Sequence, residues 1–144
     1  MRVSDILRQK GTDVATIGPE ATVEDANRML ADRSIGAVVV TRDGATVDGI
    51  IFERDVVRHL ARTGHVGFGA RIAEVMTQDI RTCSRDDSVE ELARTMTETR
   101  LRHIPVIDDS GICGIISIGD VVKRRLDDLE AEREQLHTYI QTGR

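Results

Sequence analysis

The chain contains very few aromatic residues. They make up 2% of its 144 residues, and tryptophan is absent. A hydrophobic core must therefore be built from aliphatic side chains and methionine, and no row of aromatic rings is available on which nucleic-acid bases could stack. The net charge of −5 points the same way, because phosphate backbones are bound by clustered basic side chains. We expect no nucleic-acid partner.

Cysteines and long hydrophobic runs are also scarce. Cys83 and Cys113 fit neither a C-x-x-C motif nor zinc-ligand spacing, which favours a reducing compartment. No apolar run approaches the ~20 residues of a membrane span, and the N-terminal stretch MRVSDILRQKGTD has no signal-peptide core. The sequence predicts a cytoplasmic protein with no membrane partner. No third group orients Cys83 and His103 as a nucleophile and base, and the histidines lack ligand spacing, so we expect neither catalysis nor a metal site.

What the sequence does contain is a repeat. TVEDANRMLADR at 22–33 aligns with SVEELARTMTET at 88–99, and GIIFERDVV at 49–57 aligns with GIISIGDVV at 114–122. Self-similarity of this kind indicates duplicated structural units. The pattern predicts repeat 1 at 1–63, a glycine-rich linker at 64–71, repeat 2 at 72–126 and a helical extension at 127–144.

Each copy predicts the same order of elements after an extended lead-in, namely helix, strand, strand and helix. Capping boxes are expected at the start of the first helix of each copy, with Thr22 and Asp25 in one and Ser88 and Glu91 in the other. The short β-rich runs IGAVVV and LRHIPVI end in polar turns, as strands do. A unit this small exposes apolar faces, so we expect two copies to pack together about a pseudo-twofold axis.

Asp120 allows two interpretations. Together with Ser117 it forms the S-x-x-D pattern of a helix capping box, but its carboxylate can also bind a ligand hydroxyl. In the first copy Phe52 replaces the capping serine while Asp55 remains. A carboxylate that serves only an N-cap has less reason to be present there, which favours binding. An acid in the first turn of a helix is also favoured by the helix dipole, so the structural interpretation stays open.

These motifs, in order and at the repeat offset, resemble a tandem pair of CBS domains (named after cystathionine β-synthase) in the small stand-alone form. The resemblance covers about 3–130 and rests on GIIFERD, GIISIGD, RHIPVIDDSG and VMTQDIRTCSRDDSV. It implies an α/β (α+β) fold with two β-α-β-β-α repeats about a pseudo-twofold axis and a long C-terminal helix. Such pairs bind adenosine-containing ligands in clefts between the repeats.

The resemblance also implies a ligand site in the second copy. Asp120 of this motif would hold the ribose hydroxyls, assisted by Ser117. The other implied ligand contacts are Ile80, Thr82, Ile104 and Pro105 around the base, Arg102 and His103 at the phosphates, and Arg54 reaching across from the first copy. A candidate second site consists of Thr16, Val38 and Asp55, and Phe52 at the serine position puts this site in question.

The sequence therefore predicts a non-enzymatic sensor of an adenosyl ligand, which signals by rearranging the pair or a dimer to an unspecified partner protein. AMP is the first expected ligand, because a compact cleft with one or two cations suits a monophosphate. NAD is a close second, and ATP and S-adenosylmethionine are less expected. The alternative is a ligand-free dimerisation scaffold or protein-interaction module.

The C-terminal segment carries its own pattern. Hydrophobic residues with one charged interruption recur at spacings of four and three, as in a coiled-coil seam: Val122, Leu126, Leu129, Arg133, Leu136 and Ile140. A helix packing on its own domain is one interpretation. The length of the segment favours docking onto a second subunit, so we expect a homodimer.

Overall fold

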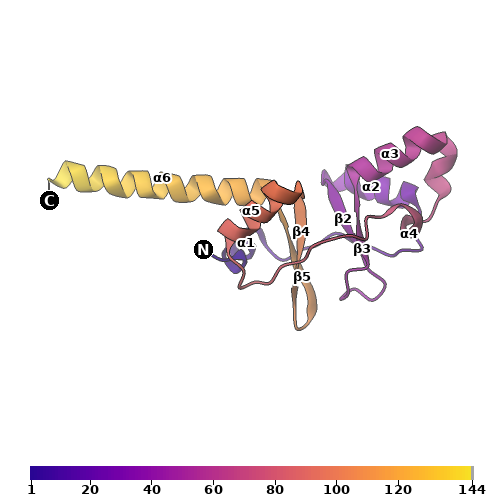
Figure 1. Ribbon diagram of the computed structural model, residues 1–144, viewed down its shortest axis with the longest axis horizontal. Coiled ribbons are helices and arrows are strands. Elements are labelled where there is room, and N and C mark those ends of the chain that lie inside the picture. The colour runs from indigo at the N-terminus through magenta and orange to yellow at the C-terminus, as the bar shows by residue number, and fades with distance from the viewer. Residues whose placement is uncertain (144) are drawn as a thin grey trace.

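A computed structural model describes residues 1–143 and shows two halves followed by a long helix (Figure 1). The first half contains a three-stranded sheet in the order β1-β2-β3, with β1 parallel to β2 and β3 antiparallel to it. Its elements are β1 (Thr16–Ile17), α2 (Val23–Arg33), β2 (Ala37–Val40), β3 (Gly49–Phe52) and α3 (Glu53–Thr63).

The second half repeats this arrangement around the antiparallel pair of β4 and β5. A parallel bridge between Cys83 and Val106 stands where β1 pairs with β2 in the first half. The elements are η1 (Gly64–Gly69), α4 (Ile72–Val75), α5 (Val89–Thr99), β4 (His103–Asp108), β5 (Gly111–Ser117) and α6 (Ile118–Thr142). The mixed α/β fold with two similar units and a long C-terminal helix is confirmed, while the boundary expected after residue 126 falls inside α6.

The helix starts follow the sequence signals in most cases. Thr22 and Asp25 form the expected reciprocal capping box, because each side chain accepts the other residue's backbone N–H. At α5 the expected box is only half present. The Ser88 hydroxyl accepts the N–H of Glu91 and donates to the carboxylate of Glu90 rather than leaving Glu91 to close the box.

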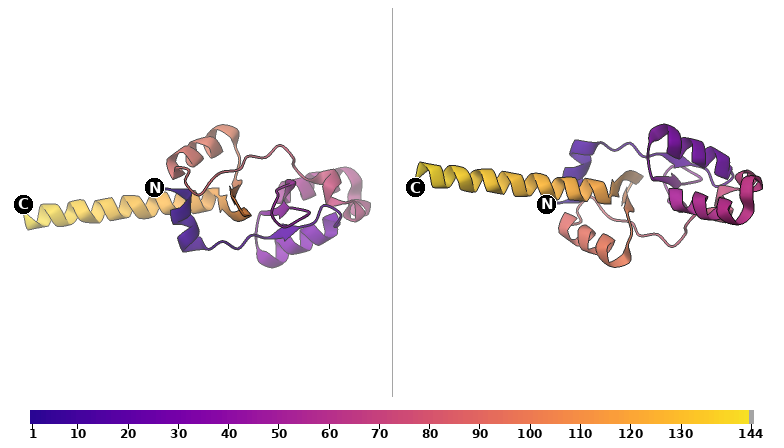
Figure 2. Two further views of the ribbon diagram at one scale, coloured as in Figure 1. Left: turned by 90° about the horizontal axis from the view of Figure 1, so that it is seen from below. Right: turned by 90° about the horizontal axis from the view of Figure 1, so that it is seen from above.

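The short helix that precedes each repeat packs on the other repeat. Val3, Ile6 and Leu7 of α1 (Val3–Lys10) lie in the core of the second half with α5 and β4. Ile72 of α4 lies in the core of the first half with α2 and β2. Figure 2 shows α1 and α5 on either side of the start of α6, and Figure 1 shows α4 beside α2 and α3. The two halves are therefore joined by an exchange of their lead-in segments.

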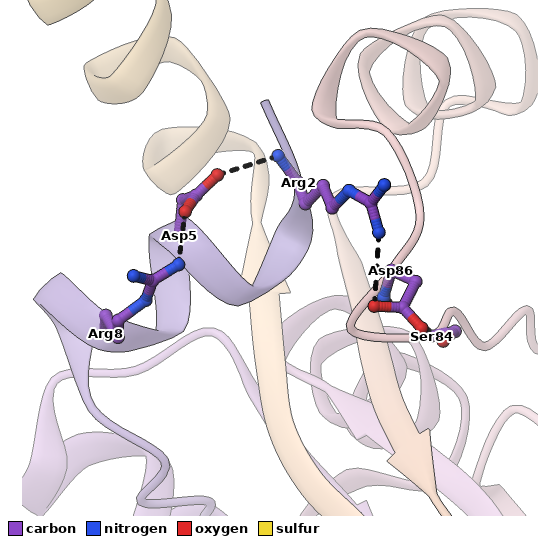
Figure 3. A network of polar contacts seen from close by, with 5 residues as sticks. All are labelled: Arg2, Asp5, Arg8, Ser84 and Asp86. Atoms are coloured by element: carbon purple, nitrogen blue, oxygen red, sulfur yellow. Dashed lines mark hydrogen bonds and ion pairs between the residues drawn. The ribbon is translucent and has the colours of Figure 1, made fainter.

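Equivalent backbone hydrogen bonds hold both exchanged helices. The N–H of Val3 donates to the Asp87 carbonyl at 2.9 Å, and the N–H of Ile72 donates to the Ala21 carbonyl at 2.8 Å. At the start of α1, the Asp5 carboxylate accepts the Arg2 N–H and also contacts Arg8, while Arg2 pairs with Asp86 at 3.5 Å (Figure 3). These hydrogen bonds hold each short helix in place. They therefore also fix the point from which the chain that follows it crosses to the other half.

The repeated glycines of the GII motifs lie where the exchanged helices approach the strands. A Cβ on Gly114 would stand 2.6 Å from Leu7 Cδ2 of α1. A Cβ on Gly49 would stand 2.8 Å from the Met76 sulfur and 2.9 Å from the Thr77 carbonyl, just after α4. Both glycines are therefore required by the close packing of the lead-in from the other repeat.

We expect Gly114→Ala to destabilise the protein by about 1–3 kcal/mol, because the added methyl group overpacks the buried contact with Leu7. The change should appear as a lower midpoint in urea unfolding. Gly119→Ala is the matched control, since the nearest atom to its Cβ is the Ser117 hydroxyl at 3.6 Å. Equal midpoints for the two variants would contradict this account of the motif glycine.

Candidate functional site

A cavity of about 460 Å³ lies between the two halves, within the range of small-molecule sites. Its wall from the second half comes from His103, Ile115 and Ser117. The rest of the lining comes from the first lead-in and from the end of α2 to the start of β2: Lys10, Asp13, Ala15, Arg33, Ser34, Ile35, Gly36 and Ala37. Neither half builds this cavity alone, because the crossing lead-in carries Lys10, Asp13 and Ala15 to the face of β5.

Asp120, in the first turn of α6, does not line this cavity but bonds to two residues that do, Ser117 and Lys10. Its Oδ2 accepts the N–H of Ser117 at 2.8 Å, and the Ser117 hydroxyl accepts the N–H of Asp120 at 3.1 Å. The expected capping box is therefore confirmed. Asp120 Oδ2 also accepts a hydrogen bond from Lys10 Nζ at 2.6 Å, and the same ammonium donates to the Ile115 carbonyl at 2.7 Å.

The charge of Asp120 is balanced within the chain. Burial works against the ionised carboxyl, but the Lys10 ammonium and the Ser117 N–H outweigh it, so the pKa of Asp120 lies below its ordinary value. On the other side of Lys10, Asp120 lines a smaller cavity of about 170 Å³ together with Ile6 and Gln9 of α1. Lys10 thus stands between the carboxylate and the larger cavity.

Asp55 has a structural role of its own in the first half. Its Oδ2 accepts the N–H of Phe52 at 2.9 Å and the Thr77 hydroxyl at 3.0 Å. The inference that Asp55 loses its capping role when phenylalanine replaces serine is therefore wrong. The backbone N–H at position 52 needs an acceptor whichever residue other than proline stands there, and Asp55 supplies it. The comparison of the two motifs does not separate capping from binding.

A second cavity of about 360 Å³ adjoins the first through His103 and Gly36. The cations that line it are Arg54 from the first repeat and Arg102 from the second. The sequence predicted that both would contact one ligand. The Arg54 guanidinium lies 4.9 Å from the centroid of the Phe52 ring. Phe52, at the position of Ser117, therefore supports an arginine instead of offering a hydroxyl.

His103 is the residue that both cavities share. Its ring centroid lies 5.9 Å from that of Phe52, and a Cβ on Gly36 would stand 3.3 Å from its Cε1. The Nδ1 atom is buried and has no hydrogen-bond partner in the part of the chain that the structure describes, residues 1–143. Burial lowers the pKa of His103 below 6.5. The Lys10 charge adds to this effect, and Asp120 opposes it.

Acidification should destabilise the protein through His103. Its folded-state pKa is lower than the unfolded value, so its contribution to stability is present above about pH 6.5 and is lost as pH falls through the folded-state pKa. We expect urea midpoints to fall between pH 7.5 and pH 5.5, with a smaller fall in His103→Gln. His65→Gln, in the exposed part of η1, should keep the full fall. An identical pH profile for His103→Gln and the unchanged protein would contradict this.

The structure brings together some of the predicted site residues and separates others. Ser117 and His103 line the larger cavity, and His103, Arg102 and Arg54 line the second. Ile80 packs with Ala37, Ile50 and Phe52 in the first half. The side chain of Ile104 is buried in the core of the second half, Val38 is buried in the core of the first, and Pro105 is also buried. Thr16 and Thr82 are exposed and do not line either cavity as described for residues 1–143.

Sequence reasoning missed the contribution of the first lead-in, above all Lys10, and of the turn that carries Arg33. The predicted repeats at 1–63 and 72–126 each include the short helix at their own start, whereas α1 and α4 pack on the opposite halves. The motif glycines were the one available signal, because a glycine in the interior of a strand marks a close approach of another segment.

Three further observations concern residues 1–143 as a whole. Burial raises the pKa of the Cys83 thiol to about 12, so it is protonated near neutral pH. No cluster of three metal-ligating side chains is present in this described part of the chain. None of its helices combines the length and apolarity needed to cross a membrane.

Two similar units with a cavity at their junction define the class of a tandem-repeat pair. The family model described as CBS domain matches the chain twice, at residues 3–62 and 72–127. The chain therefore belongs to the CBS-domain family, as a tandem pair, which confirms the resemblance.

Known proteins agree with this assignment. The mitochondrial CBS domain-containing protein CBSX3 of Arabidopsis thaliana is 33% identical over 149 aligned residues, which cover 98% of this chain and 72% of that protein. The crystal structure of the CBS-domain containing protein ATU1752 from Agrobacterium tumefaciens has 40% identity and a TM-score of 0.82, covering 87% of this chain and 99% of that one.

The CBS domain pair of protein MJ0100 has the same fold, with a TM-score of 0.78 and 23% identity over 89% of this chain and 98% of that one. That structure was determined in complex with 5′-methylthioadenosine and S-adenosyl-L-methionine.

Proposed function

We propose that this protein is a non-enzymatic regulatory module that binds an adenosine-containing ligand in the cavity between its two halves. The observation that carries the proposal is a cavity of about 460 Å³ lined by Ser117 and the cations Lys10 and Arg33, with Asp120 bonded to both Ser117 and Lys10. Two adenosyl ligands in the MJ0100 pair support the ligand class. Localisation in the cytoplasm remains part of this proposal.

Asp120 is suited to hold ribose hydroxyls once Lys10 moves aside. Within residues 1–143, the hydrogen bonds to its carboxylate all go to Oδ2, which leaves Oδ1 able to accept from a hydroxyl. The lysine side chain is a flexible stem with a compact charge, so its ammonium can leave Asp120 and meet a phosphate in the adjoining cavity. In this proposal ligand binding replaces the ion pair of Lys10 with Asp120 by an ion pair of Lys10 with the phosphate.

AMP is the ligand that we propose first, and NAD second. A single phosphate matches the two cations of the larger cavity, Lys10 and Arg33. NAD shares the adenosine and first phosphate, and its second phosphate would extend toward Arg54 and Arg102 in the adjoining cavity. ATP and S-adenosylmethionine rank lower, because the first needs more cations and the second adds a positive charge near Lys10.

The signal would follow from the two-sided construction of the cavity. One wall belongs to β5 and the other to the first lead-in and the start of β2, so a ligand that contacts both walls favours one relative placement of the halves. A partner protein that binds one placement better than another would respond to the ligand.

One observation favours the alternative of a ligand-free scaffold. The ion pair between Lys10 and Asp120 already satisfies the carboxylate, which therefore needs no ligand for its own stability. A scaffold would use the pair only for assembly or for protein interaction.

Calorimetric titration with AMP, NAD, ATP, S-adenosylmethionine and adenosine separates these functions. The sensor proposal predicts heat with AMP and a matching rise in thermal midpoint, since a ligand that binds only the folded state stabilises it. Tighter binding of NAD would reverse the order of ligands but keep the class. Absence of heat and of a thermal shift with all five ligands would favour the scaffold.

A further inference from the structure

The longest helix of the protein is covered only at its beginning. Val121 of α6 is buried against α1 and α5, and Arg125 pairs with Glu90 of α5 at 3.4 Å. From residue 129 to residue 142, every residue of α6 is exposed. Figure 1 shows this part projecting away from both halves. Most of α6 therefore lacks contact with the chain's own described residues.

The uncovered part of α6 carries an apolar seam. We define the seam as Val122, Leu126, Leu129, Leu136 and Ile140 with Arg133 among them. These five hydrophobic side chains are between 50% and 67% exposed. Their spacing places Leu126, Arg133 and Ile140 at a positions and Val122, Leu129 and Leu136 at d positions of a heptad repeat. The seam lies to one side of Val121 and Arg125, so the body of the protein leaves it open.

We propose that the seam binds the seam of a second copy of this chain, as a parallel and in-register two-stranded coiled coil. The charges beside the seam support this orientation. In a parallel pair a g residue faces the e residue five positions later on the other helix. Arg125, which also pairs with Glu90 of its own chain, then faces Glu130 of the second copy, and Glu132 faces His137 of the second copy. Twofold symmetry gives each contact twice, and the contact of Arg125 with Glu130 joins opposite charges.

The antiparallel arrangement brings like charges together. In the antiparallel register that matches the apolar layers, Glu130 faces Glu130 of the second copy and Glu132 faces Glu132 of the second copy. Like-charge contacts act against a wrong arrangement even where the apolar layers match. None of Glu130, Glu132 and His137 has an ion pair within residues 1–143, so all three are available to a second copy.

Arg133 fits the proposal as a residue that limits stability and fixes register. A single polar residue at an a position weakens a coiled coil but specifies its alignment. In the parallel register Glu132 of the second copy flanks Arg133 and compensates part of its charge. The coiled coil is short, so the dimer that we expect is one that dilution reverses.

Sedimentation equilibrium of the full chain tests the interface. The expected mass at high micromolar concentration is twice 15.9 kDa, and Leu129→Asp combined with Leu136→Asp should give the monomer mass. Both side chains are more than half exposed, so the halves should keep their thermal transition. Thr138→Asp, on the opposite side of α6, is the control and should stay dimeric. A monomer of the unchanged chain, or a dimer that survives the double substitution, would overturn the proposal.

Charge exchange tests the orientation. Glu130→Arg should weaken the dimer about tenfold, because two attractions become two repulsions at exposed positions. Adding Arg125→Glu to the same chain should restore most of the lost affinity. In an antiparallel dimer Glu130→Arg only replaces one like-charge pair by another, so an unchanged dimerisation constant would contradict the parallel arrangement.

Discussion

Asp120→Ala should weaken AMP binding by about 10–150-fold, the loss that follows from removing one charge-assisted hydrogen bond of about 1.5–3 kcal/mol. The variant removes the acceptor proposed for the ribose hydroxyls. It also removes the partner of Lys10 and of the Ser117 N–H, so it should lower the free energy of unfolding. Calorimetry gives the affinity and urea unfolding gives the stability.

Asp55→Ala is the matched control for that experiment. Asp55 accepts the N–H of Phe52 and the hydroxyl of Thr77, so its loss also removes a helix cap and a contact to the other repeat. We expect Asp55→Ala to lose stability while AMP affinity stays within about twofold. Equal losses of affinity in the two variants would mean that the effect of Asp120→Ala comes from stability and not from the ligand.

Lys10→Ala should reduce the preference for AMP over adenosine by about 10–150-fold, because the ammonium is the group that we propose for the phosphate. Removing Lys10 also removes the competitor of ribose at Asp120, so adenosine itself should bind at least as tightly as before. This competition affects AMP and adenosine alike, so it cancels in the ratio of their affinities for one variant. Titrations of each variant with both ligands give the ratio directly.

Arg8→Ala on the same helix is the control for Lys10→Ala. Arg8 pairs with Asp5 on the surface of α1 and does not line the cavity described above. Its loss should leave the ratio of the two affinities unchanged. If Lys10→Ala also leaves that ratio unchanged, Lys10 acts only as the partner of Asp120 and the phosphate lies elsewhere.

The sequence predicts the repeated units well, because their signals are local. The capping pair of Thr22 and Asp25, the box of Ser117 and Asp120, and the paired strands with polar turns each depend on residues close in the chain. The prediction failed in part where a side chain at a helix start could form either of two local hydrogen bonds. Ser88 caps its helix but binds Glu90 as well, so Glu91 does not complete the box.

The exchange of the lead-in helices could not be derived from periodicity. The hydrophobic periodicity of α1 is compatible with the core of either half. Only the packing of its side chains determines which half it joins. Leu7 fits against Gly114, and Met76 fits against Gly49. This choice places Lys10 beside Asp120 and Ile80 beside Phe52, so it determines which residues surround the cavity.

Only some of the cations around the cavities could be predicted, because the others reach the cavities through the fold and not through a repeat motif. Arg54, Arg102 and His103 belong to motifs of the repeats and meet in one cavity of about 360 Å³. Lys10 and Arg33 belong to no motif, and only the fold brings them to the larger cavity. Burial is a further property that the sequence did not show, since the side chains of Ile104 and Val38 lie in the cores of the two halves.

The most direct test of the central proposal is a crystal structure of the protein grown with saturating AMP. The account predicts the ribose hydroxyls within about 3 Å of the Asp120 carboxylate, the phosphate beside Lys10, and the Lys10 ammonium no longer on Asp120. AMP bound at Asp55 instead, or an occupied cavity in which Lys10 remains on Asp120 and the ribose lies elsewhere, would contradict it.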